Sequence, residues 1–562
     1  MTGGAMPRGG DGPGRRLAVV LFATLAAAVA LPATSLGHPE RPTSFPDPNA
    51  GTVPKQPRGA PDLVVCKADS EERIRDDLKG KKRKRNLRLL DRCRFNHIQE
   101  AVDAAGNGTH IGLLPGVYRE VPSRRVPEPN PDCAGERFYT QADGDAIGGV
   151  NDPTRGETAN YRYQRRCPNA QNLIAIIGDS DGDGDCDDKC NIAIEGQAGR
   201  KDVLIRGAGY GTTDGAKLNL IRADRADGIY LANFTIKFSD FNNIYALETN
   251  GFRFRNIESK FSREYGFLSF ASDNGLYERL EASGSGDSGI YPGSGPECET
   301  GVGLRDKYGI EIRRVNSHGN TIGYSGTAGN GIFAHDNRFH GNATGMTTDS
   351  FASGHPGMPQ DCARWVDNRV YSNNVNLFNE RRDEYCETDN RPVEERDPKV
   401  VCPTFQVPVG TGILIAGGNE NLVTGNRIYN NWRDGIKLFF VPAAFRGEGE
   451  DGIDTSFENR FLSNKMGIGP GGTARPNGND FWWDNQGYGN CWDGNRAAPG
   501  RQLTANFRLA LNDCPGLPAG PPPSPGNPAK TASQAPCAAW DPQDEVLQDP
   551  PGCDWFKRPP KP

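Results

Sequence analysis

The sequence predicts an all-β fold in which the chain winds into a long coil of short parallel strands. A segment with the frame Asn-Arg-apolar-x-small-Asn recurs, and pairs of a small and an apolar residue recur along the same stretch, often 23 or 24 residues apart. The 71 Gly and 43 Pro residues predict dense turns and no long helices. Internal repeats of this period are typical of solenoids, in which each turn of the chain packs only on its neighbours.

The repeated Asn residues predict hydrogen-bonded ladders at the bends of the coil. Copies of the frame begin at Asn337, Asn368, Asn426 and Asn459. Stacked strands lie ~4.8 Å apart, so an Asn side chain can bond to the Asn of the next turn and satisfy backbone groups at a bend. The 58 residues between Asn368 and Asn426 predict two turns of the coil, one of which lacks the frame and holds an insertion instead.

The small–apolar pairs predict one strand in each turn. Alternate residues of a strand point to opposite faces, so the apolar member points into the core and the next residue points outward. The apolar members are Ile229, Ile244, Phe267, Ile290, Ile322, Met346, Leu377, Ile413 and Ile436. The three longest intervals between them contain cysteines, and we expect these insertions to project from one side of the coil.

The N-terminal region predicts export. Arg15 and Arg16 precede an apolar run that is too short to span a bilayer, and small residues follow it, so residues 1–37 are predicted to be a signal peptide. No later segment is apolar enough to cross a membrane, and we expect a secreted monomer. Residues 38–92 are rich in Pro and then in basic residues, which predicts a disordered leader.

The remaining chain divides into a cap, the coil and a tail. Residues 93–199 are predicted to form an N-terminal cap, with a helix that begins after Asn96 as its N-cap. The apolar residues that recur at helical spacing are Ile98, Ala101, Val102 and Ala105. A helix at the open end of a coil shields its core from water. The coil is predicted over residues 200–495, and the Pro-rich residues 496–562 predict a tail.

Charge and cysteine content narrow the expected partners. A net charge of −6 gives no reason to expect a nucleic acid as partner. An even count of 14 cysteines in an exported chain predicts disulfides, although the sequence alone does not determine their connectivity. The nearest candidate pairs are Cys186–Cys190, Cys386–Cys402, Cys491–Cys514 and Cys537–Cys553.

Together these features resemble the right-handed parallel β-helix superfamily, the pectin-lyase-like fold. The resemblance covers residues 93 to about 490. It is carried by the Asn-Arg frame and by two N-terminal matches, Ile98-Gln99-x-Ala101-Val102-Asp103-Ala104-Ala105 and Ile111-x-Leu113-Leu114-Pro115-Gly116-Val117-Tyr118. It implies a right-handed parallel β-helix solenoid with an N-terminal capping helix and disulfide-stapled loop insertions.

The resemblance also implies a polysaccharide partner without naming one activity. The superfamily includes pectate and alginate lyases, polygalacturonases, uronan epimerases and non-catalytic surface proteins, and fold does not determine function. The hydrolase signature is missing, since Gly354-His355 is followed by Pro356, and the Asp-Pro-His-Glu motif of alginate epimerases is missing as well.

An acidic segment predicts a structural calcium site. Carboxylates occur at every second position, with Gly184 at the sixth, which matches the first half of a calcium loop, although Cys190 stands where a bidentate Glu is expected. The alternative is a solvated acidic hairpin closed by a disulfide between Cys186 and Cys190. The predicted calcium ligands are Asp179, Asp181, Asp183, Asp185 and Asp187.

Two histidines predict a stacked pair on the outside of the coil. His318 and His340 are 22 residues apart, about one turn, and align with Tyr371, Tyr429 and Leu462 in one column. Such a pair could bind a metal or titrate jointly. The alternative is a polar outer column that happens to include two histidines.

The candidate catalytic groove follows the outward column beside the insertions. Asp349 and Glu380 are expected on neighbouring turns, with Lys437 nearby. The two carboxylates could act as acid and base in hydrolysis, or Lys437 could abstract the proton next to a uronate carboxylate. The alternative is a set of surface ion pairs. The predicted substrate-binding residues are His355, Arg381 and Tyr291.

The sequence therefore predicts an exported β-helix protein that binds or degrades extracellular polysaccharide, as a uronan lyase or a glycoside hydrolase. The alternative is a non-catalytic surface or adhesion protein in which the coil is a rigid rod.

Overall fold

The computed structural model describes most of the chain after the predicted signal peptide. The described residues are 43–47, 51–120, 161–209, 217–296, 308–351, 355–378, 401–446, 454–506, 511, 513–514, 528–538, 540 and 552–562. The predicted signal peptide, residues 1–37, lies outside these ranges. Within them, no helix is long and apolar enough to cross a membrane.

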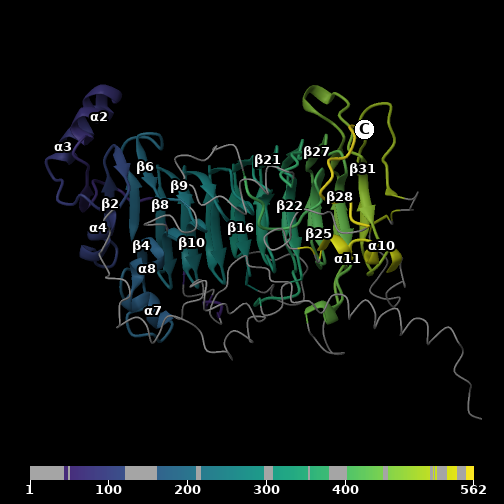
Figure 1. Cartoon of the computed structure of the whole chain (residues 1–562), viewed down its shortest axis with the longest axis horizontal. Helices are drawn as coiled ribbons and strands as arrows, with labels where there is room; N and C mark the ends of the chain where they lie inside the picture. The colour runs from purple at the N-terminus through teal and green to yellow at the C-terminus, as the bar shows by residue number, and fades with distance from the viewer. Residues whose placement is uncertain are drawn as a thin grey trace, which may run out of the picture.

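Three parallel sheets, named A, B and C, wind into one coil whose strands stack along the long axis (Figure 1). Neighbouring strands of each sheet come from successive turns of the coil, which we call rungs, and they pair in parallel. The fold is the predicted right-handed parallel β-helix. Parallel strands need a crossover connection between them, and here the remainder of each turn of the coil connects one strand of a sheet to the next.

Strand order in each sheet follows the order of the chain. Sheet A contains β1 (Leu63–Val65), β2 (His110–Leu113), β5 (Ala193–Gly196), β8 (Ile229–Ala232), β11 (Asn250–Arg255), β14 (Asp273–Glu278), β17 (Ile310–Arg313), β20 (Ile332–His335), β23 (Arg364–Val366), β26 (Leu422–Thr424), β29 (Arg460–Leu462) and β32 (Cys491–Asp493). Sheet B contains β3 (Gly116–Tyr118), β6 (Val203–Arg206), β9 (Thr235–Ser239), β12 (Glu258–Ser262), β15 (Glu281–Ser283), β18 (Asn316–His318), β21 (Arg338–His340), β24 (Arg369–Tyr371), β27 (Arg427–Tyr429) and β30 (Lys465–Met466). Sheet C contains β4 (Asn172–Ile177), β7 (Asn219–Asp224), β10 (Asn242–Leu247), β13 (Phe267–Phe270), β16 (Ser288–Gly293), β19 (Ile322–Tyr324), β22 (Thr344–Asp349), β25 (Thr411–Ala416), β28 (Asp434–Phe439) and β31 (Asn479–Trp483).

The predicted inward column corresponds to sheet C, except at Ile229 and Ile322. Phe267 pairs with Ile244 and Ile290, and Ile413 pairs with Met346 and Ile436, as expected of one column. Ile229 instead belongs to sheet A. On β19 it is Tyr324, not Ile322, that pairs with Ile290 and Met346, so the prediction slips by two residues there. The slip arises because the large ring of Tyr324 fills the core position that an aliphatic residue was expected to fill.

The long interval in the middle of the coil is a single rung. Met346 of β22 pairs directly with Ile413 of β25, so these two strands lie on adjacent rungs. Leu377, which was predicted to lie on a strand between them, belongs to no strand. The prediction of two turns between Asn368 and Asn426 is therefore wrong. Asn368 Nδ2 donates to Asn426 Oδ1 at 3.1 Å, which places the two residues on adjacent rungs.

The predicted Asn ladders are confirmed, and they are more regular than the frame suggested. One buried ladder joins Asn337, Asn368, Asn426, Asn464 and Asn495, and a second joins Asn320, Asn342, Asn373, Asn431 and Asn477. Each Oδ1 also accepts the backbone N–H of the Asn on the preceding rung. The frame that starts at Asn459 lies one corner earlier, in sheet A, because Asn464 and not Asn459 continues the ladder from Asn426.

The N-terminal region is more ordered than predicted. The expected disordered leader, residues 38–92, contains β1 and two helices, α2 (Ser70–Asp77) and α3 (Gly80–Leu90). Their buried side chains form a small core, and a disulfide joins Cys66 to Cys93. The coil also begins before residue 200, since β1 to β5 already contribute to all three sheets.

The predicted helix near residue 98 is α4 (Ile98–Ala104), and it contacts the first strands of sheets A and C. Its apolar face joins the main core. Its N-cap is His97 rather than Asn96, and no side chain of the cap residue bonds to the helix. The buried carboxylate of Glu120 instead accepts the N–H groups of Ile98 and Gln99 at 3.0 and 3.1 Å. Two short helices, α7 (Tyr161–Arg166) and α8 (Pro168–Gln171), precede β4.

The C-terminal segment packs onto the outside of sheet C. It includes α10 (Pro528–Ala532) and α11 (Ala535–Ala538), which Figure 1 places beside the last rungs. A separate apolar cluster contains Trp540, Trp555 and Phe556 together with outward residues of β25 and β28, such as Leu414 and Phe439. Two 3₁₀ turns, Ala443–Arg446 and Pro470–Gly472, complete the elements of the described residues.

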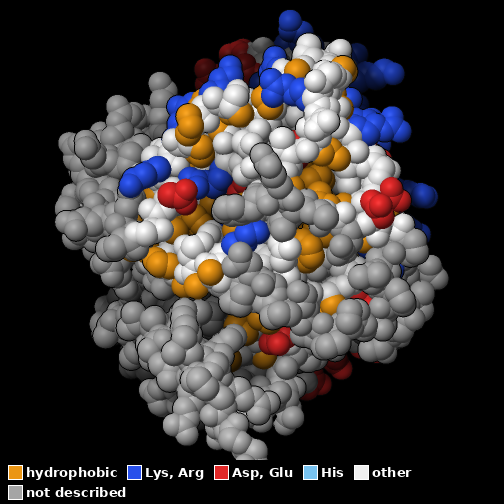
Figure 2. Space-filling view, turned by 90° about the vertical axis from the view of Figure 1, so that its right-hand side faces the viewer, with side chains coloured by type: hydrophobic (Ala, Val, Ile, Leu, Met, Phe, Trp, Pro, Cys, Tyr) orange, Lys and Arg blue, Asp and Glu red, His pale blue; other side chains and the backbone are white. Residues whose placement is uncertain are grey.

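The end of the coil is closed by aromatic side chains. Phe481, Trp483 and Trp492 belong to the main core, and the Trp483 and Trp492 rings lie 4.9 Å apart. Figure 2, which faces this end, shows hydrophobic side chains at the centre and Lys and Arg side chains toward the top.

Three predicted disulfides are present, Cys186–Cys190, Cys491–Cys514 and Cys537–Cys553. Cys402 is also disulfide-bonded, but its predicted partner Cys386 lies outside the described residues.

Candidate functional site

The outer face of sheet C carries a cluster of acidic and tyrosine side chains. Asp349, at the end of β22, lies beside Thr327, which follows β19 on the preceding rung. Thr327 Oγ1 donates to Asp349 Oδ2 at 2.6 Å. Tyr291 on β16 is hydrogen-bonded to Thr327 and lies in the field of Asp349. Three rungs of sheet C therefore bring these side chains to one place.

A second carboxyl group, Asp287, completes the cluster. It lies just before β16, in the field of Asp349, and it is hydrogen-bonded to Tyr265. Burial raises the pKa of Asp287 to about 7, and the charge of Asp349 adds to this rise. Burial also raises the pKa of Asp349. A pair of buried carboxyl groups with raised pKa values can hold a proton near neutral pH.

The cluster is enclosed by aromatic and apolar side chains. The rings of Tyr265 and Tyr291 lie 4.4 Å apart, and Phe45 from the N-terminal segment packs against the same cluster. Burial raises the pKa of both tyrosines well above the ordinary value. The four side chains Asp287, Asp349, Tyr265 and Tyr291 are each at most 3 % exposed.

The structure brings only part of the predicted site together. Asp349 pairs with Ala416 on the next rung, so Glu380 does not occupy the neighbouring position of this column as expected. Glu380 and Arg381 themselves lie outside the described residues. Lys437 lies two rungs beyond the rung of Asp349 and in the neighbouring column, where it pairs with Leu414.

Lys437 lies beneath the C-terminal segment. Its Nζ donates to Gln534 Oε1 at 2.7 Å and lies 4.3 Å from the ring centroid of Trp482 and 5.7 Å from that of Trp555. Burial lowers the pKa of Lys437 to about 8, although the nearby Asp434 opposes this shift. The Asp434 carboxylate is 4.0 Å from Nζ. The Pro-rich tail of the prediction thus includes a segment that covers a predicted catalytic residue.

His355 is half-buried near the cluster. Its ring meets Phe270 of β13 edge-on at 5.3 Å between centroids. Phe270 belongs to the apolar group that also contains Tyr265 and Tyr291. Of the predicted substrate-binding residues, Tyr291 and His355 therefore lie near Asp349.

Sequence reasoning missed Asp287, Tyr265 and Thr327. Asp287 and Tyr265 lie just before β16 and β13, at a corner of the coil whose residues were not included in the predicted columns. Thr327 was missed because the predicted register of β19 is two residues out of step with the observed one. A periodic signal was present for the corner, because Glu264 and Asp287 are 23 residues apart and both are buried. Acidic residues that recur at the repeat period can therefore indicate a buried acidic site at a corner as well as on a strand.

The predicted histidine stack is confirmed on the outer face of sheet B. The His318 and His340 rings lie 5.3 Å apart, and His340 stacks on Tyr371, which stacks on Tyr429. Leu462 is not in this column, because it pairs with Thr424 in sheet A. Leu462 was predicted in the wrong column because the frame that starts at Asn459 lies in sheet A, whereas the other copies of the frame lie in sheet B.

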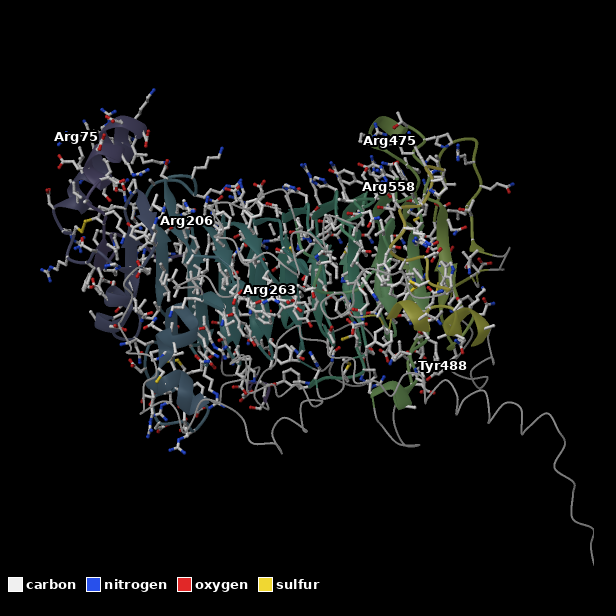
Figure 3. The ribbon with its side chains drawn as sticks, viewed as in Figure 1. Arg75, Arg206, Arg263, Arg475, Tyr488 and Arg558 are labelled. Carbon is white, nitrogen blue, oxygen red and sulfur yellow. A yellow bond between two sulfur atoms is a disulfide. The ribbon has the colours of Figure 1, made fainter. Side chains whose placement is uncertain are left out.

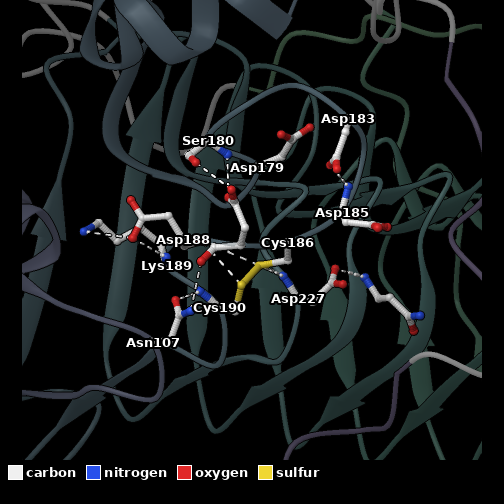
Figure 4. The surroundings of a disulfide bond; sticks show 12 residues. Asn107, Asp179, Ser180, Asp183, Asp185, Cys186, Asp188, Lys189, Cys190 and Asp227 are labelled. Carbon is white, nitrogen blue, oxygen red and sulfur yellow. Dashed lines mark hydrogen bonds and ion pairs between the residues drawn. A yellow bond between two sulfur atoms is a disulfide. The ribbon is translucent and has the colours of Figure 1, made fainter.

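The acidic loop that was predicted to bind calcium projects before β5, and Figure 4 shows it around the disulfide Cys186–Cys190. Carboxylate oxygens of Asp179, Asp181 and Asp183 lie within 4.8 Å of one another. Asp181 and Asp183 are exposed, whereas Asp179 is buried and forms a 2.8 Å ion pair with Arg225.

The two later carboxylates of the acidic loop are turned toward the loop itself or to solvent. Asp187 accepts hydrogen bonds from the hydroxyl and backbone N–H of Ser180, both at 2.6 Å, which lowers the pKa of Asp187. Asp185 is exposed. The available donors are all oxygen atoms, which fits a hard cation such as calcium, and Asp181 and Asp183 are the residues best placed to hold it.

Comparisons with known proteins find similarity at the level of fold. No protein-family model matches the sequence, and no curated protein matches it. The A-module of mannuronan C-5 epimerase AlgE4 from Azotobacter vinelandii is 11% identical with a TM-score of 0.39, over 74% of this chain and 93% of that chain. The pectate lyase Pel9A is 14% identical with a TM-score of 0.30, over 74% of each chain. The surface adhesin PfbA of Streptococcus pneumoniae is 10% identical with a TM-score of 0.33, over 57% of this chain and 80% of that chain. Likeness at this level assigns no activity to this chain.

Proposed function

We propose that this protein is exported and acts on an extracellular polysaccharide, as a uronan lyase or a glycoside hydrolase, through the cluster on sheet C. The observation that supports this proposal best is the buried pair of Asp287 and Asp349 beside Tyr265 and Tyr291. Strongly shifted pKa values at a cluster of titratable groups are typical of catalytic sites. The disulfides are those expected of a protein that matures in an oxidising compartment.

The chemistry proposed for the cluster is proton transfer. A carboxyl group with a pKa of about 7, such as Asp287, can give or take a proton at neutral pH. A hydrolase needs such a group to protonate the glycosidic oxygen, and a lyase needs a base to remove the proton next to a uronate carboxylate. The tyrosine hydroxyls are further candidate donors. Because all four side chains are buried, a sugar can reach them only if the covering side chains move.

The burial of the cluster favours a second candidate function. A protein in which the outer face of sheet C is closed by its own segments would not cleave polysaccharide at this cluster, and any binding would use another face of the coil. The covering of Lys437 by the segment that contains Gln534 and Trp555 supports this alternative. In that case the buried carboxyl groups would be structural.

Product analysis separates these functions. The protein is incubated with polygalacturonate, alginate and neutral dextran, and absorbance of unsaturated products and new reducing ends are both measured. A lyase gives both signals, a hydrolase gives reducing ends alone, and Asp287→Asn or Asp349→Asn lowers the rate at least 100-fold. The matched control is Asp336→Asn, an exposed residue at a corner of the coil, which leaves the rate unchanged. Absence of product from all three polymers would exclude these activities on them and leave the binding function.

A calcium ion is proposed as a structural cofactor of the acidic loop. Asp181 and Asp183 are exposed carboxylates close to each other and to Asp179, and mutual repulsion among them is relieved by a cation. The site is remote in the fold from the sheet C cluster, so calcium would stabilise the loop and take no part in the chemistry.

A further inference from the structure

Sheet B carries two columns of side chains on its outer face that the sheet C cluster does not use. One column is cationic, because Arg338 pairs with Arg369, which pairs with Arg427, which pairs with Lys465. The other is the ring column, because His318 pairs with His340, which pairs with Tyr371, which pairs with Tyr429. The residues between the columns, such as Phe339 and Val370, point into the core. We call the eight residues of these two columns the basic strip.

The cations of the basic strip have few internal partners. Arg338, Arg369 and Lys465 are exposed, and within the described part of the chain neither Arg338 nor Arg369 forms an ion pair or a hydrogen bond through its side chain. The one hydrogen bond that the Arg427 side chain forms with the described residues runs from Nη1 to the backbone oxygen of Gly469, at 3.3 Å. Like charges directly opposite each other in a sheet are unfavourable. Among the described residues, no carboxylate forms an ion pair with Arg338 or Arg369 to offset this repulsion.

The positive charge is confined to one part of sheet B. Toward the N-terminus the same column continues through Asn316 to Glu281 and Glu258, so its sign reverses. The column therefore presents cations only over its last four rungs, a span of about 14 Å at ~4.8 Å per rung. Figure 3 labels Arg475 near the C-terminal end of the same upper edge of the coil, and Arg475 lies close enough to influence Tyr429.

Three of the four rings in the ring column present edges rather than faces to solvent, whereas Tyr429 is buried. The stacked rings are nearly parallel, with angles of 13° between His318 and His340, 10° between His340 and Tyr371, and 3° between Tyr371 and Tyr429. Each inner ring is covered on both faces by its neighbours, and His318, His340 and Tyr371 are half-exposed. The Nε2 atoms of His340 and His318 already face Asn316 Oδ1 at 3.0 Å and Glu281 Oε1 at 3.5 Å. The remaining ring nitrogens and the Tyr371 hydroxyl are the edge groups that can hydrogen-bond to a ligand.

The fixed charge of the basic strip comes from its Arg and Lys side chains. Burial, followed by the charges of His318 and Arg338, lowers the pKa of His340 to about 4. His340 is therefore neutral at pH 7 and acts as a hydrogen-bonding group. The combination is a line of fixed cations beside a line of polar ring edges.

We propose that the basic strip binds an acidic polysaccharide that lies along the coil axis, with its acidic groups on the arginines and its hydroxyl groups on the ring edges. Arginine is suited to carboxylate and sulfate because its guanidinium group donates two parallel hydrogen bonds. A periodic row of cations matches a polymer with repeated charges. A single-stranded nucleic acid needs free ring faces on which its bases stack, and the stacked column does not offer them.

This proposal concerns a different face from the sheet C cluster. It rests on the proposed function only in the class of polymer, and it adds a second surface that holds an acidic form of that polymer. The basic strip would hold the chain whether or not the sheet C cluster cleaves it.

Binding is tested on the full-length protein by isothermal titration calorimetry. Polygalacturonate supplies carboxylates, dextran sulfate supplies sulfates, dextran is the neutral polymer, and oligothymidylate is the nucleic acid. We expect binding to one or both acidic polysaccharides, weakening as salt rises, because exposed charges are screened. The double variant Arg338→Gln, Arg369→Gln should bind at least tenfold more weakly. The control Arg460→Gln, Arg501→Gln removes two exposed charges elsewhere and should bind as the wild type does.

Several results would overturn the proposal. These are equal binding by the strip variant and the wild type, binding of dextran as tight as that of the acidic polymers, and binding of oligothymidylate as tight as that of either acidic polysaccharide. A folding defect is recognised separately by the Tm, which should stay equal or rise in the strip variant because two opposed like charges are removed. Asp349→Asn should keep polymer binding, so loss of turnover and loss of binding test different sites.

Discussion

Asn426 shows how single side chains hold successive rungs together. Its Oδ1 accepts the backbone N–H of Asn368 at 2.9 Å, and its Nδ2 donates to Trp365 O at 2.7 Å and to Asn464 Oδ1 at 3.1 Å. Asn426 is fully buried, so no water replaces these partners. Neighbours in the ladder make the same bonds, which explains why the Asn at this position recurs along the sequence.

We predict that Asn426→Ala lowers the free energy of unfolding by at least about 2 kcal/mol, because it leaves the N–H of Asn368 and the oxygen of Trp365 buried without partners, at about 1–3 kcal/mol for each group. Urea denaturation followed by circular dichroism measures the change. A loss below about 0.5 kcal/mol would mean that water enters the corner and satisfies these groups.

Asp287 makes the stability of the protein depend on pH. Burial raises its folded pKa to about 7, whereas an unfolded Asp titrates near about 3.9, so the folded state binds an additional proton between these values. The free energy of unfolding should therefore fall as the pH rises through this window, by up to about 1.4 kcal/mol per pH unit. The lowered pKa of His340 acts in the opposite direction below about pH 6.5.

We predict that Asp287→Asn removes its share of this slope. Urea denaturation at several pH values from about 4.5 to about 7.5 should give a profile that is flatter toward high pH in the variant than in the wild type. The comparison uses slopes, since the substitution can change the absolute stability at every pH. Parallel profiles would show that Asp287 titrates normally in the folded protein.

The acidic loop is the element for which we propose a bound cation. Backbone N–H groups of Gly182 and Gly184 donate to Asp179, so the loop is folded around that buried carboxylate. The exposed carboxylates of Asp181 and Asp183 have no such support beyond local turns. An oxygen-binding cation would join them to Asp179.

We predict that calcium raises the Tm and that Asp181→Asn, Asp183→Asn abolishes the effect. A ligand present at about 100 times its Kd stabilises the folded state by about 2.7 kcal/mol, which differential scanning calorimetry resolves. The matched control is Asp76→Asn, Asp77→Asn, two exposed carboxylates on α2. An unchanged Tm at millimolar calcium would favour the solvated hairpin.

The repeat period of the sequence locates some strands of sheet C correctly and others wrongly. The inward residues of β13, β16, β22, β25 and β28 were predicted because each rung buries an aliphatic or aromatic residue at the same phase. The phase was lost at β19, where Tyr324 fills the core, and between β24 and β25, where a long insertion resembled an additional rung. Periodicity measures distance along the chain, and an insertion changes that distance without changing the stacking.

On the scale of the whole molecule, the outer faces of sheets B and C differ in what covers them. Sheet C is covered by the C-terminal segment and by apolar packing, whereas sheet B presents the basic strip to solvent. Each rung contributes one strand to both faces, so a column on either face is assembled from residues far apart in the sequence. Arg369 and Arg427, 58 residues apart, lie side by side in this way.

The coil could be predicted from the repeats, because a repeated Asn and a repeated apolar residue are both satisfied when rung stacks on rung. Three of the candidate disulfides between cysteines close in sequence are present, although the sequence alone left their connectivity open. Only the tertiary structure decided which residues are neighbours across rungs. It brought Asp287 to Asp349, separated Lys437 from both, and aligned the cations of sheet B. The physical reason is that lateral neighbours in a solenoid are set by how many residues each rung contains, and insertions make that number vary.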